Sequence, residues 1–239
     1  MTKERPPNPT EAVLEQRKRL LVAGMTIAAL AFVGLLVYLG ALSRSQAEIK
    51  IDLAEVETGI TEDGFPYQGS PDAPVKLIEY SDYLCGHCQS FVLETEPKII
   101  NDYVATGKVQ YIYHYYALGE AQVLLEEAGH CAADQGHFWA YNKLMFENQE
   151  QFRTVESLEG LQALLNEFAR QAELDVAEFE TCWNSHQYRE SIIKLILSAR
   201  EMGIESTPTF SIQDELIVGN QPYQVFQQTI EASLAEAKK

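Results

Sequence analysis

At residues 85–88 the chain reads Cys85-Gly86-His87-Cys88, directly after the apolar run 75–80 and before an amphipathic segment that extends to Val104. This order predicts a strand, a turn that carries both cysteines, and a helix. A thiol in the first turn of a helix faces unpaired backbone N–H groups and the positive end of the helix dipole. Both favour the thiolate, so we expect Cys85 to have a lowered pKa and to form a reversible disulfide with Cys88.

The same cysteine spacing occurs in zinc and haem sites, and the rest of the sequence argues against both. A structural zinc site takes four ligands, usually from two such pairs, whereas the remaining cysteines, Cys131 and Cys182, lie 51 residues apart. Haem attachment needs a histidine after the second cysteine, and this chain has Gln89 there. We therefore interpret the pair as redox-active and expect neither a metal nor a cofactor.

Length and charge limit the possible functions. The chain has 239 residues, which is enough for one domain and additional segments. Its formal charge of −17 at pH 7 argues against nucleic acid as a partner.

The N-terminal region predicts a membrane anchor. Residues 20–42 contain no charge, and a helix of this length reaches roughly 35 Å, against about 30 Å for the hydrocarbon core of a bilayer. The basic cluster 17–19 precedes this run, so the positive-inside rule places residues 1–19 in the cytoplasm. We expect a single transmembrane helix at 20–42, followed by a tether at 43–68.

A cleaved signal peptide is the alternative, with residues 45–47 as its cleavage site. The apolar core of a signal peptide is usually about 7–15 residues long, which favours the uncleaved anchor. Either interpretation delivers the domain to an oxidising compartment, where disulfides persist. For that reason we expect a structural disulfide between Cys131 and Cys182 rather than two buried free thiols.

The rest of the chain completes an α/β pattern. A second strand is predicted at 109–115, apolar stripes with helical spacing fill about 118–203, a hairpin follows at 209–212 and 216–218, and a closing helix runs over about 223–237. The strand–helix–strand half requires a parallel pair. The strand–strand–helix half adds antiparallel strands, which gives a mixed sheet with an all-helical insertion.

Several short runs of sequence resemble those of proteins with the thioredoxin fold and occur in the same order along the chain. The helical insertion narrows the resemblance to the DsbA-like thiol-disulfide oxidoreductases. Besides the cysteine pair, the runs are Gly69–Val75, Glu79–Tyr83, Gln135–Trp139, Gly203–Phe210 and Gly219–Tyr223. The thioredoxin-like domain is accordingly expected to span residues 69–237.

The resemblance implies roles for a loop that lies far from the cysteines in sequence. It implies that Pro208 follows a cis peptide bond, which X–Pro chemistry permits. It also implies that this loop lies against the disulfide, where Thr207 offers backbone groups to an extended substrate.

Roles are also expected for Glu79, from the resemblance, and for His87, from its place between the two cysteines. Glu79 matches the buried acid of the family, which implies a proton relay for Cys88 with a pKa raised by desolvation. The alternative is a solvent-facing acid on a half-exposed strand. His87 is expected to stabilise the Cys85 thiolate as a cation or N–H donor.

These assignments predict an oxidase that donates the Cys85–Cys88 disulfide to exported cysteine-containing proteins. The resemblance implies an integral-membrane, quinone-linked partner that reoxidises it. We expect a monomer, because no dimerisation segment is evident. A disulfide reductase or isomerase is one alternative, and a non-enzymatic binding module with structural cysteines is another.

Overall fold

The computed structural model describes residue 25, residues 56–213 and residues 215–237. Apart from Met25, the predicted cytoplasmic tail, the predicted transmembrane helix 20–42 and residues 43–55 of the predicted tether lie outside these residues. Among the residues that are described, no helix has both the length and the apolar character needed to cross a membrane.

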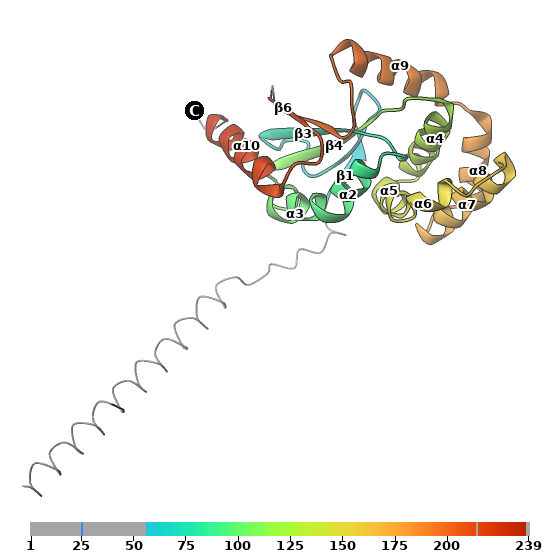
Figure 1. Ribbon diagram of the computed structural model, residues 1–239, viewed down its shortest axis with the longest axis horizontal. Helices are drawn as coiled ribbons and strands as arrows, with labels where there is room; N and C mark the ends of the chain where they lie inside the picture. Colours follow the sequence, from blue (N-terminus) through green and yellow to red (C-terminus); the bar gives the residue numbers. More distant parts are fainter. Residues whose placement is uncertain (1–24, 26–55, 214, 238–239) are drawn as a thin grey trace, which may run out of the picture. The chain divides into compact units, whose positions relative to one another are not determined.

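Six strands form one mixed sheet in the order β1-β2-β4-β3-β5-β6 (Figure 1). The strands are β1 Thr58–Ile60, β2 Pro66–Gln68, β3 Val75–Ser81, β4 Val109–Tyr115, β5 Thr209–Ile212 and β6 Glu215–Val218. Strands β3 and β4 are parallel, and all other neighbours in this sheet are antiparallel. The predicted mixed sheet, with its parallel pair and late hairpin, is confirmed.

Alternation along β3 separates the two faces of the sheet, because successive side chains of a strand point in opposite directions. Val75 and Leu77 belong to the main core, whereas Tyr80 belongs to a smaller cluster with Ala199 of α9 (Arg189–Glu201). Glu79 has the same parity as Leu77 and therefore faces the main core.

Helices α2 (Gly86–Glu94) and α10 (Tyr223–Glu236) cover the main-core face, together with α3 (Glu96–Ile99) and the π-helical turn that follows it, Ile100–Val104. Three phenylalanines join α2, β5 and α10. The ring centroid of Phe91 lies 4.3 Å from that of Phe210 and 5.4 Å from that of Phe226. This aromatic contact fixes the cysteine-bearing helix against the sheet.

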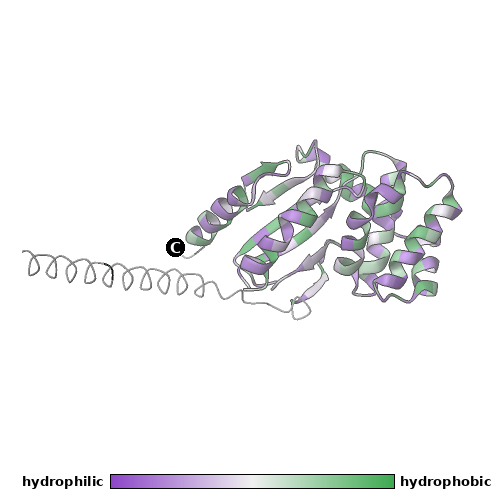
Figure 2. Cartoon of the chain, turned by 60° about the horizontal axis from the view of Figure 1, so that its bottom comes forward, coloured by the Kyte–Doolittle hydropathy of each residue, from purple (hydrophilic) through white to green (hydrophobic). Residues whose placement is uncertain are grey.

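The helical insertion predicted at about 118–203 is confirmed. It contains α4 Glu120–Asp134, α5 Phe138–Glu147, α6 Gln149–Phe152, α7 Leu158–Gln171, α8 Val176–Ser185 and α9. Two of its helices begin at the capping residues favoured at helix starts: Ser157 accepts from the Gly160 N–H, and Asp175 accepts from the Ala177 N–H. Figure 2 shows hydrophilic and hydrophobic residues interleaved along the helices, as amphipathic packing requires.

The sheet begins earlier in the chain than the expected domain start at residue 69. Residues 58–68, expected to be tether, form the hairpin β1–β2, and β2 pairs with β4. The Trp139 indole N–H of the insertion donates to the Tyr67 carbonyl at 3.0 Å. Gly69 ends the hairpin with φ +95°, and a Cβ there would lie 2.5 Å from the Val109 carbonyl oxygen. Only glycine fits that close approach.

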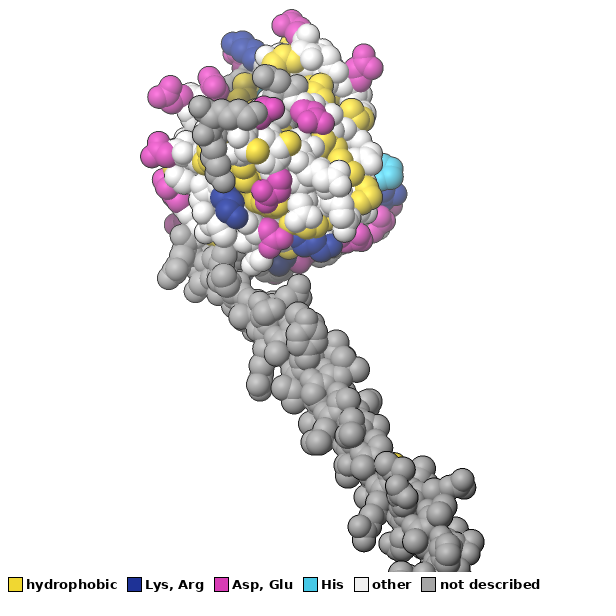
Figure 3. Space-filling model, turned by 90° about the vertical axis from the view of Figure 1, so that its left-hand side faces the viewer, with side chains coloured by type: hydrophobic (Ala, Val, Ile, Leu, Met, Phe, Trp, Pro, Cys, Tyr) yellow, Lys and Arg dark blue, Asp and Glu magenta, His cyan; other side chains and the backbone are white. Residues whose placement is uncertain are grey.

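Most acidic side chains of the described residues lie at the surface. Figure 3 shows acidic side chains spread over the face in view, with fewer basic ones among them. Ion pairs at the protein surface, such as Lys194 with Glu190 at 2.7 Å, join strongly exposed groups. Because water and salt screen exposed pairs, they add little to stability, and the charge governs solubility more than folding.

Candidate active site

A turn after β3 places Cys85 at the start of α2. The Asp82 carboxylate accepts the Leu84 N–H at 2.7 Å, and the Asp82 carbonyl accepts the Cys85 N–H at 3.0 Å. Cys85 is thereby the N-cap of α2, with extended backbone angles of −82° and 116°. Its sulfur occupies the position where a capping side chain meets the free N–H groups of the first turn.

The surroundings of the Cys85 sulfur bear on its charge. It accepts the Cys88 N–H at 3.4 Å and lies 3.3 Å from the Thr207 carbonyl oxygen. Both cysteines are free thiols; Cys85 is half-buried and Cys88 is fully buried. The accessible sulfur is therefore the one that an external thiol can reach.

The two cysteines have opposite protonation states. Hydrogen bonding lowers the pKa of Cys85 to about 5, with the Cys88 thiol as the strongest donor, followed by the Thr207 side chain and the N–H groups of Cys88 and His87. Burial raises the pKa of Cys88 well above its ordinary value. At neutral pH the pair is a thiolate at Cys85 and a thiol at Cys88, which gives one nucleophile and one proton donor.

His87 acts on the Cys85 sulfur through its backbone. Its side chain is exposed, and the contribution of His87 to the lowered pKa of Cys85 comes from its backbone N–H. Stabilisation of the thiolate by the imidazole therefore stays a prediction.

Glu79 is fully buried, so the alternative of a solvent-facing acid is wrong. The Tyr111 hydroxyl donates to its carboxylate, while its Oε1 has no hydrogen-bond partner. Burial raises the pKa of Glu79 to about 7, and the charge of Cys85 acts in the same direction. A carboxyl group with this pKa can both accept and donate a proton near neutrality.

The Thr207–Pro208 peptide bond is cis. The loop that contains it leads directly into β5, where Thr209 is the register partner of Tyr80 on β3. The Gly219 N–H donates a hydrogen bond to the Pro208 carbonyl at 2.8 Å. Pairing of β5 with the strand that precedes the cysteines thus brings Thr207 against Cys85.

Asp82 and Gln149 are two residues near the cysteines that the sequence did not single out. Burial raises the pKa of Asp82 to about 6. The buried Gln149 amide donates to the carbonyls of Tyr83 at 2.9 Å and Cys85 at 3.0 Å, which ties α6 to the cysteine turn. Asp82 was readable as an acid that starts a turn, whereas nothing local signals the contact of Gln149.

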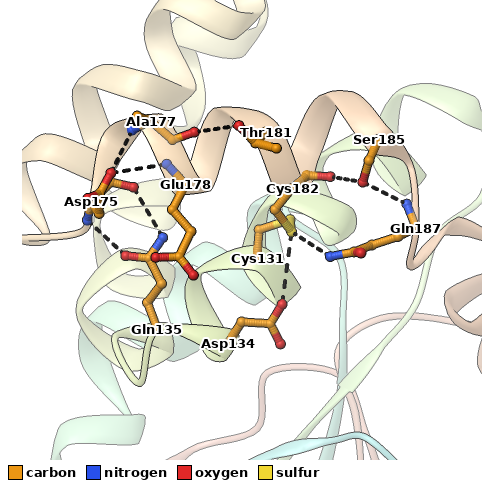
Figure 4. Close-up of a pocket in the computed structure, with 10 residues that line it drawn as sticks. All are labelled: Cys131, Asp134, Gln135, Asp175, Ala177, Glu178, Thr181, Cys182, Ser185 and Gln187. Carbon is orange, nitrogen blue, oxygen red and sulfur yellow. Dashed lines mark hydrogen bonds between the residues drawn. A yellow bond between two sulfur atoms is a disulfide. The ribbon is translucent and has the colours of Figure 1, made fainter.

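Cys131 and Cys182 form a disulfide with a Cα–Cα distance of 5.9 Å, between α4 and α8 of the insertion. A pocket of about 500 Å³ adjoins it (Figure 4). Acidic side chains of Asp134, Asp175 and Glu178 line this pocket. Within the described residues, no group of His, Cys, Asp and Glu side chains is arranged to hold a metal ion.

Comparison with known proteins agrees with this geometry. Residues 61–232 match the thioredoxin family. Over 183 residues the chain is 25% identical to disulfide bond formation protein D of Bacillus subtilis, covering 72% of this chain and 78% of that protein. The crystal structure of oxidised BdbD from Bacillus subtilis superposes with a TM-score of 0.66 at 25% identity, over 75% of this chain and 98% of that chain. The crystal structure of α-DsbA1 from Wolbachia pipientis, at 24% identity over 80% and 96% of the two chains, shows the same fold with a TM-score of 0.63.

The chain belongs to the thioredoxin family. Within it the chain is a DsbA-like protein thiol-disulfide oxidoreductase, as the resemblance implied. A binding module with purely structural cysteines does not fit a cysteine whose pKa is about 5.

Proposed function

We propose that this protein is an oxidase that donates the Cys85–Cys88 disulfide to exported cysteine-containing proteins. One observation supports the direction most strongly: hydrogen bonds at Cys85 lower the pKa of its thiol to about 5. Whatever stabilises the thiolate stabilises the reduced enzyme, and this makes the disulfide a stronger oxidant.

The exchange proceeds in two steps. A substrate thiolate attacks the Cys85 sulfur of the disulfide, forms a mixed disulfide and expels Cys88 as a thiolate, which takes a proton from Glu79. A second substrate thiolate then attacks the substrate sulfur of the mixed disulfide and expels the Cys85 thiolate. The substrate loses two electrons and gains a disulfide, while the enzyme becomes a dithiol.

Thr207 has a place in this exchange. Its carbonyl group adjoins the Cys85 sulfur, and a substrate joined to that sulfur can pair its backbone with this loop. Pairing through backbone groups suits substrates of varied sequence, because it requires no particular side chains.

The proposed location is the outer face of the cell membrane or the periplasm. In this proposal residues 20–42 span the membrane, residues 1–19 are cytoplasmic and the catalytic domain is extracytoplasmic. The Cys131–Cys182 disulfide supports an oxidising compartment. An integral-membrane, quinone-linked partner would return the reduced enzyme to its disulfide form.

The redox equilibrium of the Cys85–Cys88 couple against glutathione tests the direction. We expect a potential closer to about −120 mV, typical of strong oxidants, than to about −270 mV, typical of thioredoxin. A value near the thioredoxin figure would contradict an oxidase and favour a reductase. Fractionation of cells that produce the full chain, with and without residues 20–42, tests the anchor.

A further inference from the structure

The junction between α5 and α6 of the insertion is bonded to the chain on both sides of the cysteine pair. We propose that Gln149, the first residue of α6, is a positioning residue for disulfide exchange, whose amide holds the Cys85 backbone in the conformation that stabilises the thiolate. The inference rests on the proposed function, because it takes Cys85 as the exchanging sulfur.

The Gln149 side chain donates two hydrogen bonds to the backbone beside the nucleophile. Its amide nitrogen lies 2.9 Å from the Tyr83 carbonyl oxygen and 3.0 Å from the Cys85 carbonyl oxygen. Carbonyl oxygens only accept hydrogen bonds, so these two partners fix which end of the amide faces the turn. Because 64 residues separate Gln149 from Cys85, the packing of the insertion creates this contact.

Two further contacts join the same junction to the cysteine motif. The Gln89 side chain, directly after Cys88, donates to the Phe146 carbonyl at 2.7 Å. The rings of Phe146 and Tyr83 pack with their centroids 5.0 Å apart. Figure 1 shows α5 beside α2, the helix that carries Gln89. The junction therefore contacts the chain both before and after the cysteine pair.

Stability alone does not account for a glutamine at position 149. Only 1% of the Gln149 surface is exposed, and its Oε1 has no hydrogen-bond partner within the described part of the chain. A buried polar atom without a partner is unfavourable. The side chain makes its two bonds to the turn although they leave this oxygen unpaired, which favours a role in placing the turn.

The backbone conformation of Cys85 decides where its sulfur lies. With angles of −82° and 116°, Cys85 caps α2, and its sulfur lies 3.4 Å from the Cys88 nitrogen and 3.3 Å from the Thr207 carbonyl oxygen. In the disulfide form a covalent bond holds the sulfur in place. In the reduced form hydrogen bonds and packing must do so. Loss of the Gln149 bonds should therefore destabilise the reduced form more than the disulfide form.

Gln149→Met tests this role through the redox equilibrium with glutathione. Methionine is an unbranched side chain that fills a similar space but donates no hydrogen bond. We expect the equilibrium constant for oxidation of glutathione by the protein to fall about three- to tenfold, the range that one ordinary hydrogen bond contributes. The pKa of Cys85, measured by alkylation, should rise by up to about one unit, because a tenfold change corresponds to one unit.

A purely structural role for Gln149 predicts a different result. The variant would then lose the same free energy of unfolding in both redox forms, and the glutathione equilibrium would not change, because it reports the difference between the forms. An unchanged equilibrium would overturn the proposal. If Gln149→Met does not fold, Gln149→Asn takes its place with the same expectation, because its amide is one methylene too short to reach both carbonyls.

Gln135→Met is the matched control. The Gln135 amide also joins distant backbone, since it donates to the Asp175 carbonyl at 3.1 Å and accepts the Asp175 N–H at 2.8 Å. Both partners lie within the insertion, so the loss of these bonds should leave the glutathione equilibrium unchanged. An equal shift in Gln135→Met and Gln149→Met would overturn the proposal, because any loosening of the insertion would then suffice.

The comparison between variants separates this inference from the direction of the reaction. If the unmodified protein equilibrates as thioredoxin does, the oxidase proposal fails, whereas a shift in Gln149→Met still supports the positioning role. If the unmodified protein is strongly oxidising and Gln149→Met matches it, the positioning role fails and the oxidase proposal stands.

Discussion

The carbonyl oxygen of Thr207 lies 3.3 Å from the sulfur of Cys85, although 122 residues separate them in the chain. The contact exists because β5 pairs with β3, the strand that leads into the cysteine turn. The same sheet therefore positions Cys85 and the loop of Thr207, to which the proposed function assigns substrate binding.

Cys85→Ser should abolish oxidation of reduced peptides and leave the fold intact. Serine can cap α2 as the cysteine does, so the free energy of unfolding should change by no more than about 1 kcal/mol. Cys88→Ser, incubated with an oxidised peptide, should instead accumulate a mixed disulfide, because its Cys85 thiolate attacks the peptide disulfide and no second cysteine resolves the product. Mass spectrometry detects this species. Residual peptide oxidation by Cys85→Ser would rule out Cys85 as the exchanging sulfur.

Thr207→Val should raise the pKa of Cys85, because the Thr207 side chain is one of the groups that lower it. A lost hydrogen bond of about 1 kcal/mol corresponds to somewhat less than one pKa unit. The pH dependence of Cys85 alkylation by iodoacetamide measures this change. Thr209→Val is the control, since that hydroxyl donates to the Ser206 carbonyl at 2.7 Å. Equal pKa values in both variants would remove Thr207 from the thiolate site.

The stability of the reduced protein relative to the oxidised protein should increase with pH. Folding lowers the pKa of Cys85 from 9.0 to about 5. A lowered pKa contributes stability that is fully present above about pH 9 and is lost as the pH falls through about 5. Urea unfolding of both redox forms at about pH 5 and pH 8 measures the trend, in a Glu79→Gln background that removes the buried acid. A difference that does not change with pH would contradict a stabilised thiolate.

Removal of the second disulfide should destabilise the insertion without affecting the thiolate. The bond joins residues 51 apart, and the chain-entropy model gives roughly 4 kcal/mol for a loop of this size. Cys131→Ala/Cys182→Ala should lower the urea midpoint accordingly, while alkylation of Cys85 keeps its pH dependence. A shift in that dependence would show that the insertion and the cysteine turn are coupled.

Local pattern predicted much of the fold. The apolar run before the cysteines, the stripes of the insertion and the late hairpin each have a period that identifies the element. The same alternation puts Glu79 on the face opposite Ile78 and Tyr80, and this face carries the main core. The hairpin β1–β2 was not predicted, because strands of three residues are too short to show alternation. Its Gly and Pro residues indicate turns alone.

The remaining parts of the site depend on contacts between distant segments. Gln149 reaches the cysteine turn from α6, and Tyr111 reaches Glu79 only after β4 pairs with β3. Neither contact leaves a periodic or compositional signal near the residue itself. The exposure of the His87 side chain likewise follows from how α2 lies on the sheet, which its spacing between the cysteines does not reveal.

The short outer strands of the sheet bear on aggregation. The long central strands β3 and β4 are paired on both sides, and the sheet ends in β1 with three residues and in β6 with four. Unpaired backbone groups at a sheet edge are the usual template for association between chains, and short edge strands limit it. An enzyme that acts on cysteine-containing polypeptides binds incompletely folded chains, which aggregate readily. The short edge strands leave such chains few backbone groups with which to extend the sheet.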